Sequence, residues 1–323
     1  MQLTIATFNL ENLFTRYARL DDPLDDNASR VIMTGVTSID YQGSPLSRAT
    51  TVLQRNNTAR AILDCAPDLL AVQEVENLWT LRLFNDQYLS GYFDRMILIE
   101  GNDGRGIDIG LCVRKDCPVT ISGIHTHMDD LDPGNKNATR ISRYFSESTG
   151  EIRVDGALFS RDCLEVDVDA GTTLLTFLVN HFKAQDGSKS SDARRNRQAQ
   201  RVAEIATAVQ SRGRLPIVMG DLNEDFSATP SNLEPLKDLV GPLLTDLFAN
   251  QRDVWTHYYV ARNETSRLDY ILVDKSLTVA STSVLRHGIT LKCARAGDRY
   301  PTVGYVDSEA SDHCPVTVAL SLP

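Results

Sequence analysis

The feature that most constrains the fold of this chain is a series of short apolar runs, each of which starts or stops at a polar residue. The runs are rich in Val, Ile and Leu and are bounded by Gly, Asn, Asp or Pro, which is typical of β-strands. Because several runs are apolar throughout, we expect their strands to be covered on both faces. The predicted strands cover residues 3–8, 69–72, 96–99, 107–113, 174–179, 215–219, 268–273 and 316–320.

Apolar residues at helical spacing predict three helices between these strands. The predicted helices cover residues 50–63, 78–89 and 192–210. The last is the clearest, because one of its faces carries an apolar stripe of Val202, Ile205, Ala206 and Val209. We expect Ser190 or Ser191 to cap its N-terminus. Since strands and helices alternate irregularly, we predict an α+β fold in which two sheets face each other with helices outside.

Nothing in the chain marks a boundary between domains. Its 323 residues, with a mass of 35.8 kDa, suit one large domain or two modest ones. Residues 19–47 and 126–150 are polar and are expected to be long loops, but neither has the composition of an interdomain linker. The sequence contains no internal repeat and no low-complexity tract. We therefore predict a single domain over residues 1–323.

The charge balance limits the partners of the protein. Lys plus Arg is 33 and Asp plus Glu is 43, so the net charge is −10. A chain this acidic should not coat itself with nucleic acid nonspecifically. A substrate that carries phosphate would need a local feature that overcomes this repulsion, such as a metal ion bound by carboxylates.

The sequence also indicates where the protein works. No stretch approaches the ~20 apolar residues of a membrane span, and the first residues lack the basic and apolar regions of a signal peptide. We expect a cytoplasmic protein, with secretion left open if a leader has been removed, and no membrane or protein partner is evident. The six cysteines form no C-x-x-C pair, so we expect mostly buried free thiols and leave disulfides open.

Polar residues recur where the predicted strands end or begin. Five such places carry Asn9, Glu74, Asp221 with Asn223, Asp269, and Asp312 with His313. A turn or cap explains any one of them, but five together indicate a shared rim. Carboxylates that share a rim cannot all stay ionised without a counter-ion. Hard oxygen ligands favour Mg²⁺, Mn²⁺ or Ca²⁺ over zinc.

Six short motifs occur in the order found in a known superfamily. They are Thr7-Phe8-Asn9-Leu10, Gln73-Glu74, Asn180-His181, Gly220-Asp221-Leu222-Asn223, Leu268-Asp269-Tyr270 and Ser311-Asp312-His313. In these motifs the chain resembles the endonuclease/exonuclease/phosphatase superfamily, which includes deoxyribonuclease I, endonucleases of the exonuclease III type, neutral sphingomyelinases and inositol polyphosphate 5-phosphatases. The resemblance implies a four-layered α/β/β/α sandwich of two packed mixed sheets flanked by helices, as in deoxyribonuclease I.

The resemblance also implies a divalent metal at one end of the two sheets. Mg²⁺ is expected, with Mn²⁺ or Ca²⁺ as alternatives. By resemblance, Asn9 and Glu74 hold the metal. Asp312 lies at the same end and ligates the metal directly or through water.

Five residues are catalytic by the same resemblance. Asp221 and Asn223 position or activate the attacking water and help to bind the phosphate. Asp269 orients His313, and His181 contacts the scissile phosphate. A carboxylate paired with an imidazole supplies an acid or a base near neutral pH. The sequence leaves open whether Asp221 or His313 takes the proton of the water.

Three basic residues are candidates for contact with a phosphate-bearing substrate. Arg105 lies in a Gly-rich turn, which either grips a phosphate or is a simple hairpin. Lys183 follows His181 by two residues. Arg197 shares one face of the predicted helix with two other arginines, and this face either contacts phosphate or is a solvated charged face.

Together these features predict a Mg²⁺-dependent phosphoric ester hydrolase, foremost a phosphodiesterase or nuclease that uses in-line attack of an activated water. The alternative is a phosphomonoesterase or a lipid or inositol phosphate phosphodiesterase, but neither a membrane-contact hairpin nor a dense basic cluster is evident. A non-catalytic binding module is disfavoured because every acid of the motifs and His313 of the last motif are present.

The aromatic residues at 255–259 either stack on bases or pack in the core, and core packing is favoured for Trp255 and one Tyr.

Overall fold

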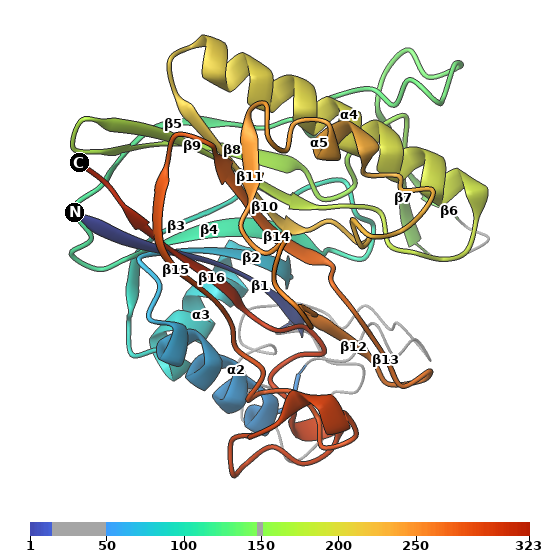
Figure 1. Cartoon of the computed structure of the whole chain (residues 1–323). Coiled ribbons are helices and arrows are strands. Elements are labelled where there is room, and N and C mark those ends of the chain that lie inside the picture. The colour runs from blue at the N-terminus through green and yellow to red at the C-terminus, as the bar shows by residue number, and fades with distance from the viewer. Residues whose placement is uncertain (15–49, 147–150) are drawn as a thin grey trace.

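Two mixed β-sheets pack face to face, and helices cover their outer faces (Figure 1). The structure, a computed structural model, describes residues 1–14, 50–146 and 151–323. The loop predicted over residues 19–47 lies outside the described residues. The observed layers confirm the predicted α/β/β/α sandwich of two mixed sheets flanked by helices.

The first sheet contains the N-terminal strand at its centre. Its strands are β1 (Gln2–Leu13), β2 (Leu69–Val75), β3 (Phe93–Leu98), β4 (Asp108–Arg114), β15 (Thr278–Val284) and β16 (Val316–Ser321). Their order is β15-β16-β1-β2-β4-β3, with β1 and β2 parallel and the other neighbours antiparallel. Helices α2 (Val52–Cys65) and α3 (Leu78–Tyr88) pack on its outer face.

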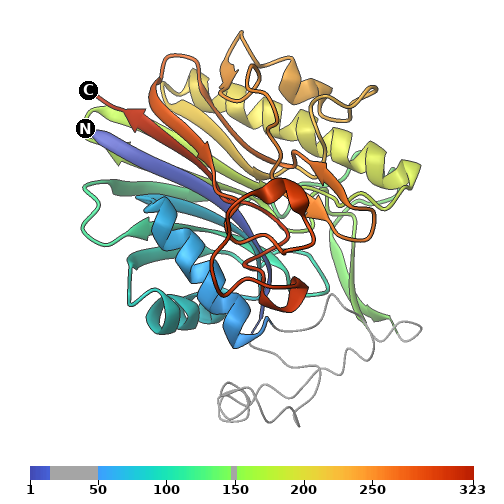
Figure 2. The same ribbon diagram turned by 60° about the horizontal axis from the view of Figure 1, so that its bottom comes forward.

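The second sheet lies on the other side of the core. Its strands are β5 (Thr120–His125), β8 (Cys163–Ala170), β9 (Thr173–His181), β10 (Leu215–Asp221), β11 (Leu244–Asp246) and β14 (Asp269–Asp274). Their order is β11-β14-β10-β9-β8-β5, and β9 and β10 are parallel. Helices α4 (Lys189–Ser211) and α5 (Glu234–Lys237) cover its outer face, opposite α2 (Figure 2).

The central core lies between the sheets, and the strand period of two decides which side chains enter it. In β1, Leu3 and Ile5 face the second sheet, whereas Ala6 and Phe8 face α2 and α3. The inward positions of β1 therefore continue along the strand to Asn9, which is buried. Strands β9, β10 and β14 alternate in the same way, so their polar ends also enter the space between the sheets.

Helix α4 begins earlier than the sequence predicts. Its N-cap is Ser188, whose hydroxyl accepts a hydrogen bond from the backbone N–H of Ser191 at 3.2 Å. The prediction of Ser190 or Ser191 as the cap was wrong. The hydroxyl of Ser191 instead donates to the carboxylate of Asp186 at 2.6 Å, which holds the turn before the helix.

Two short hairpins lie outside the main sheets. β6 (Ser142–Ser146) pairs with β7 (Glu151–Asp155), and β12 (His257–Tyr259) pairs with β13 (Glu264–Ser266). The prediction of an irregular loop over residues 126–150 was wrong for β6, because the partner that stabilises this strand lies beyond that range. Two 3₁₀ turns precede β16, at Ala294–Ala296 and Val306–Ser308.

Each of the six cysteines is a free thiol, and all except Cys65 are buried. This confirms the expectation that most of them are buried free thiols. In the described part of the chain, none of the helices has both the length and the apolar character needed to cross a membrane.

Candidate active site

Three neighbouring strands of the second sheet bring polar side chains to one end of the space between the sheets. Asp221 pairs with His181 across the parallel strands β10 and β9, and with Asp269 across the antiparallel strands β10 and β14. All three side chains are buried. Because these positions are in register and continue the inward faces of their strands, the strand pairing assembles the centre of the site.

Gly220 permits this pairing. Its φ is +128°, a conformation that residues with a side chain rarely adopt, and a Cβ at this position would lie 2.0 Å from the carbonyl oxygen of Asn180. Strands β9 and β10 can therefore approach each other here only at a glycine. This accounts for the glycine that precedes Asp221 in its motif.

A buried carboxylate–imidazole pair lies beside Asp221. Nδ1 of His313 is 2.8 Å from Oδ2 of Asp269. The hydroxyls of Thr256 and Ser311 accept the backbone N–H groups of Asp269 and His313, each at 3.0 Å, so both partners are held. Burial lowers the pKa of His313, but the carboxylates of Asp269 and Asp221 outweigh burial and raise this pKa well above its usual value. The imidazole is therefore a cation near neutral pH.

Asp221 occupies the centre of the site. Its Oδ2 accepts hydrogen bonds from the side-chain amides of Asn9 and Asn223, each at 3.1 Å. The same oxygen is 3.4 Å from Nε2 of His181 and 3.8 Å from Nε2 of His313. Burial raises the pKa of Asp221 to about 6, against the opposing charge of His313. This carboxyl can therefore exchange a proton near neutral pH.

His181 lies between the central carboxylate and the first sheet. Its Nε2 is 3.9 Å from Oε1 of Glu74, and its buried Nδ1 has no hydrogen-bond partner among the described residues. Burial lowers the pKa of His181 well below its usual value, and the charge of Arg161 lowers it further. A neutral imidazole can donate one N–H to a phosphoryl oxygen.

An acidic cluster adjoins these residues at the end of the first sheet. It consists of Glu11, Glu74, Glu309 and Asp312. Burial raises the pKa of the three glutamates, to about 8 for Glu309, and the charge of Asp312 raises each of them further. A break in the register of β2, where the φ of Glu74 is +60°, turns this side chain out of the regular strand pattern.

The chemistry of this cluster fits a divalent cation. Repulsion among clustered carboxylates is relieved by a bound dication. Carboxylate and amide oxygens are the ligands that Mg²⁺, Mn²⁺ and Ca²⁺ prefer. The predicted ligands Asn9, Glu74 and Asp312 supply only such oxygens.

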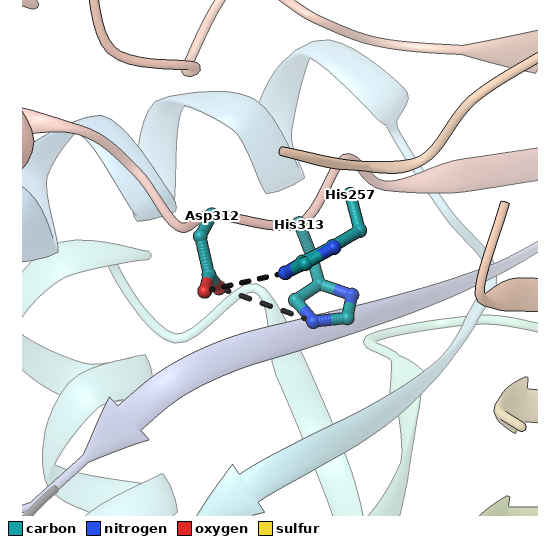
Figure 3. Close-up of side chains that lie close together, drawn as sticks. All are labelled: His257, Asp312 and His313. Carbon is teal, nitrogen blue, oxygen red and sulfur yellow. Dashed lines mark ion pairs between the residues drawn. The ribbon is translucent and has the colours of Figure 1, made fainter. Parts of the chain in front are cut away.

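Asp312 also faces two histidines, His257 and His313, whose rings lie next to each other (Figure 3). Its Oδ2 is 3.7 Å from Nε2 of His257, and its Oδ1 is 3.9 Å from Nε2 of His313. These three residues form one group with the spacing of metal ligands, and Asp221, Asp269 and His313 form another. Burial raises the pKa of Asp312, but the two histidines outweigh burial and lower it, so this carboxyl is an anion.

Sequence reasoning did not identify Glu11, His257 or Glu309, which also lie at the site. Glu11 lies two residues after Asn9, and its Oε2 accepts the backbone N–H of Asp312 at 3.0 Å. Its position directly after the first motif was the signal that could have indicated it. His257 reaches the site because β12 forms a backbone bridge to His313, and no local pattern in the sequence reports this pairing.

Arg105, one of the predicted substrate contacts, lies near the acidic cluster. It forms an ion pair with Asp103 at 3.0 Å, and Arg161 shares this carboxylate at 3.1 Å. Burial raises the pKa of Glu74, and the charges of Arg161 and Arg105 oppose this rise. Arg161, which sequence reasoning also missed, is buried and donates a hydrogen bond to the carbonyl of Phe182 at 3.1 Å, next to His181.

The other two predicted substrate contacts have partners elsewhere. Lys183 forms an ion pair with Asp186 at 3.4 Å. Arg197 binds both carboxylate oxygens of Asp132, at 2.6 and 2.9 Å. Within the described residues, neither side chain forms a hydrogen bond or ion pair with the residues at the end of the sheets. Their roles stay predictions.

The structure thus gathers all the residues that were predicted to be catalytic or to hold metal. They are His181, Asp221, Asn223, Asp269, His313, Asn9, Glu74 and Asp312. Their individual roles are not tested by this placement. Two packed sheets that carry such a site at one end have the fold of a class of phosphoric ester hydrolases.

The chain belongs to the endonuclease/exonuclease/phosphatase family, whose model matches residues 6–313. Members of this family are hydrolases that use divalent metals. No curated protein matches the chain.

Several solved structures share the fold over the whole chain. Truncated TDP2 from Caenorhabditis elegans is 13% identical, with a TM-score of 0.58, over 100% of this chain and 98% of its own. The human nocturnin catalytic domain with bound sulfate is 15% identical, with a TM-score of 0.58, over 100% and 95%. The mannosyl-6-phosphatase of Bacteroides thetaiotaomicron is 17% identical, with a TM-score of 0.57, over 99% and 100%. At these identities, the similarity shows the fold alone.

Proposed function

We propose that this chain is a divalent-metal-dependent phosphodiesterase that cleaves nucleic acid by in-line attack of water on the scissile phosphate. The observation that carries the proposal is the buried arrangement of Asp221, His313 and Asp269. Oδ2 of Asp221 lies 3.8 Å from Nε2 of His313, and Nδ1 of the same ring is held by Asp269. A proton acceptor thus lies beside an oriented cation, as hydrolysis of a phosphoric ester requires.

Asp221 accepts the proton of the attacking water. With a pKa of about 6, it is mainly ionised at neutral pH and still basic enough to take up a proton. The amides of Asn9 and Asn223 hold the carboxylate in one orientation. Help from Asn223 in binding the phosphate stays a proposal, since its side-chain amide donates to Asp221 and to the carbonyl of Phe182.

His313 supplies positive charge. Asp269 accepts the hydrogen bond from Nδ1–H, so Nε2–H remains to face the reacting phosphate. There it stabilises the charge that develops on the phosphoryl oxygens or the leaving oxygen. The neutral His181 donates an N–H to another phosphoryl oxygen.

Asn9, Glu74 and Asp312 are the residues that would hold the divalent metal, and Mg²⁺ is the ion that we propose. When bound, such an ion neutralises phosphoryl oxygens and helps the leaving group. The raised pKa values of Glu11 and Glu309 show that negative charge at this end of the sheet is unfavourable, and a bound cation would relieve that repulsion and favour their ionised forms.

Nucleic acid is the proposed substrate because local features offset the net charge of −10. Arg105 and Arg161 place positive charge beside Glu74. Lys183 and Arg197 are proposed as further phosphate contacts. Such limited basic surface implies modest, metal-dependent affinity rather than nonspecific coating. The single domain and the cytoplasmic location stay predictions.

A panel of substrates tests the proposed function. The protein is assayed with Mg²⁺ on plasmid DNA, DNA and RNA oligonucleotides, a model phosphodiester, a sugar phosphate monoester, sphingomyelin and inositol phosphates. We expect hydrolysis of nucleic acid and of the model diester. Activity confined to monoesters would reject the nuclease and favour a phosphomonoesterase. Activity confined to sphingomyelin or inositol phosphates would favour the lipid or inositol phosphate alternative.

A further inference from the structure

The β12–β13 hairpin carries an exposed aromatic ring next to the site. Tyr259 is 47% exposed, whereas its neighbour Tyr258 is only 3% exposed. Because side chains alternate along a strand, Tyr259 lies on the same side of β12 as His257. The rings of these two residues are nearly parallel, at an angle of 19°, with their centres 6.5 Å apart.

The ring of Tyr259 is connected to the catalytic histidine by the ring between them. The centre of the His257 ring is 4.7 Å from that of His313, and Nε2 of His257 is 3.7 Å from Asp312. The three rings therefore form a row from the buried end of the sheets to the solvent. A substrate whose phosphate lies at His313 has its adjacent groups beside this row.

The hairpin is bonded to the segment that carries Asp312 and His313. His257 forms a backbone bridge with His313, and the backbone N–H of Tyr258 donates to the carbonyl of Asp312 at 2.9 Å. The hydroxyl of Tyr258 donates to the side chain of Asn263 at 2.9 Å, which closes the hairpin on itself. The backbone that carries Tyr259 is therefore held in place. A base that stacks on this ring would have a fixed position relative to the scissile phosphate.

Positive charge accompanies the exposed ring. The guanidinium of Arg262 lies 5.7 Å from the centre of the Tyr259 ring. An aromatic ring beside a cation matches a nucleotide, which presents a planar base and an anionic phosphate together. The hairpin therefore offers both kinds of contact within one short segment.

We infer that Tyr259 stacks on the base next to the scissile phosphate, and that the substrate is single-stranded or unpaired nucleic acid. In a duplex each base is already stacked and paired, so a protein ring gains a base only where the strand is open. The inference rests on the proposed nuclease function and names the form of its substrate.

Kinetics of matched variants test this inference. Tyr259→Ala, Tyr259→Phe and the control Trp79→Ala, which removes an exposed ring on α3, are assayed with Mg²⁺. The substrates are a single-stranded oligonucleotide, its duplex, and the same strand with an abasic residue on either side of the cleaved phosphate. We expect Tyr259→Ala to raise the KM for the single strand about 5- to 100-fold. Tyr259→Phe and Trp79→Ala should match the wild type.

The abasic strand separates stacking from damage to the site. On this strand Tyr259→Ala and the wild type should be equal, because no base is present to stack. An equal loss on the abasic strand, or no loss on the intact one, would overturn the inference while the nuclease function stands. Faster cleavage of the duplex than of the single strand would also overturn it. Absence of cleavage of every nucleic acid would reject the proposed function itself.

Discussion

Individual carboxyl groups in this protein differ because of their surroundings rather than their residue type. Asp221 is buried and has a pKa raised to about 6. Asp103 is half-buried, but Arg161 and Arg105 outweigh the effect of burial and lower its pKa to about 2. These differences arise from contacts between distant parts of the chain, so residue type alone could not predict which acid exchanges protons and which forms ion pairs.

Replacement of Asp269 tests whether this residue orients His313 for catalysis rather than only stabilising the fold. In Asp269→Asn, Nδ1 of His313 loses its anionic partner, and we expect kcat to fall about 10²- to 10⁴-fold. Asp274→Asn is the matched control, since Asp274 is a buried aspartate at the other end of the same strand. Steady-state kinetics and thermal melts are compared. A similar loss in both variants would contradict the role of Asp269.

Asp108 should make stability depend on pH. Burial raises its pKa to about 7, above the ordinary value of 3.8, so the folded protein binds this proton more tightly than the unfolded chain. The contribution of Asp108 to the free energy of unfolding is most favourable below about pH 4 and is lost as the pH rises to about 7. Asp108→Asn should therefore gain stability relative to the wild type across this range.

Urea unfolding at several pH values measures this difference. The Asn side chain keeps an oxygen that can accept the backbone N–H of Gly101, the partner of Asp108 at 2.7 Å. A difference between variant and wild type that is constant from pH 4 to 8 would contradict the prediction.

At the scale of elements, strand pairing and helix anchoring decide where the motifs lie. Arg195 lies near the start of α4, where a cation opposes the helix dipole. The structure explains it, because its Nε donates to Glu224 at 2.8 Å and its Nη1 donates to the carbonyl of Lys183 at 3.0 Å. Glu224 follows Asn223 directly, so α4 holds the loop that carries this residue.

Gly220→Ala should disrupt the pairing of β9 with β10. The added Cβ would lie 2.0 Å from the carbonyl oxygen of Asn180, and the φ of +128° adds strain. We expect a loss of about 2–5 kcal/mol in the free energy of unfolding. Gly213→Ala, at a turn with a φ of +76° and no atom within 4 Å, should lose only about 1 kcal/mol. Equal losses by denaturant titration would show that the close approach is unimportant.

For the whole molecule, the packing of two sheets brings together acids from the first sheet and catalytic residues from the second. Glu74 and Asp221 belong to different sheets. Nε2 of His181 lies 3.9 Å from Oε1 of Glu74 and 3.4 Å from Oδ2 of Asp221. Metal binding at this junction should therefore stabilise the sandwich as well as support activity.

Mg²⁺ should raise the melting temperature, and EDTA should reverse this effect and stop hydrolysis. At a Mg²⁺ concentration 100-fold above Kd, the stabilisation is about 2.7 kcal/mol. Glu74→Gln should reduce the shift because it removes a ligand charge. The control Glu204→Gln, on α4, should keep it. Thermal melts across a Mg²⁺ titration give this readout without an activity assay, and an unchanged shift in Glu74→Gln would reject Glu74 as a ligand.

Local patterns were enough to predict the layers and the motif residues of the site. The strand pattern placed Asn9 at a strand end, and the structure confirms the two facing sheets with outer helices that these patterns predicted. The resemblance of the motifs supplied the remaining assignments. These features are readable because side-chain alternation and strand-end residues are properties of neighbouring positions in one chain.

Only the tertiary structure showed that Arg161, His257 and Tyr259 lie around the motif residues of the site. Burial lowers the pKa of His181 and the charge of Arg161 lowers it further, and His257 enters through a bridge between segments far apart in the sequence. Likewise, the sequence predicted that acids share a rim, but the structure showed that Glu11 and Glu309 add to them at one end of the sheets. Distances, burial and electrostatic fields depend on which segments pack together, and no local pattern in a sequence records them.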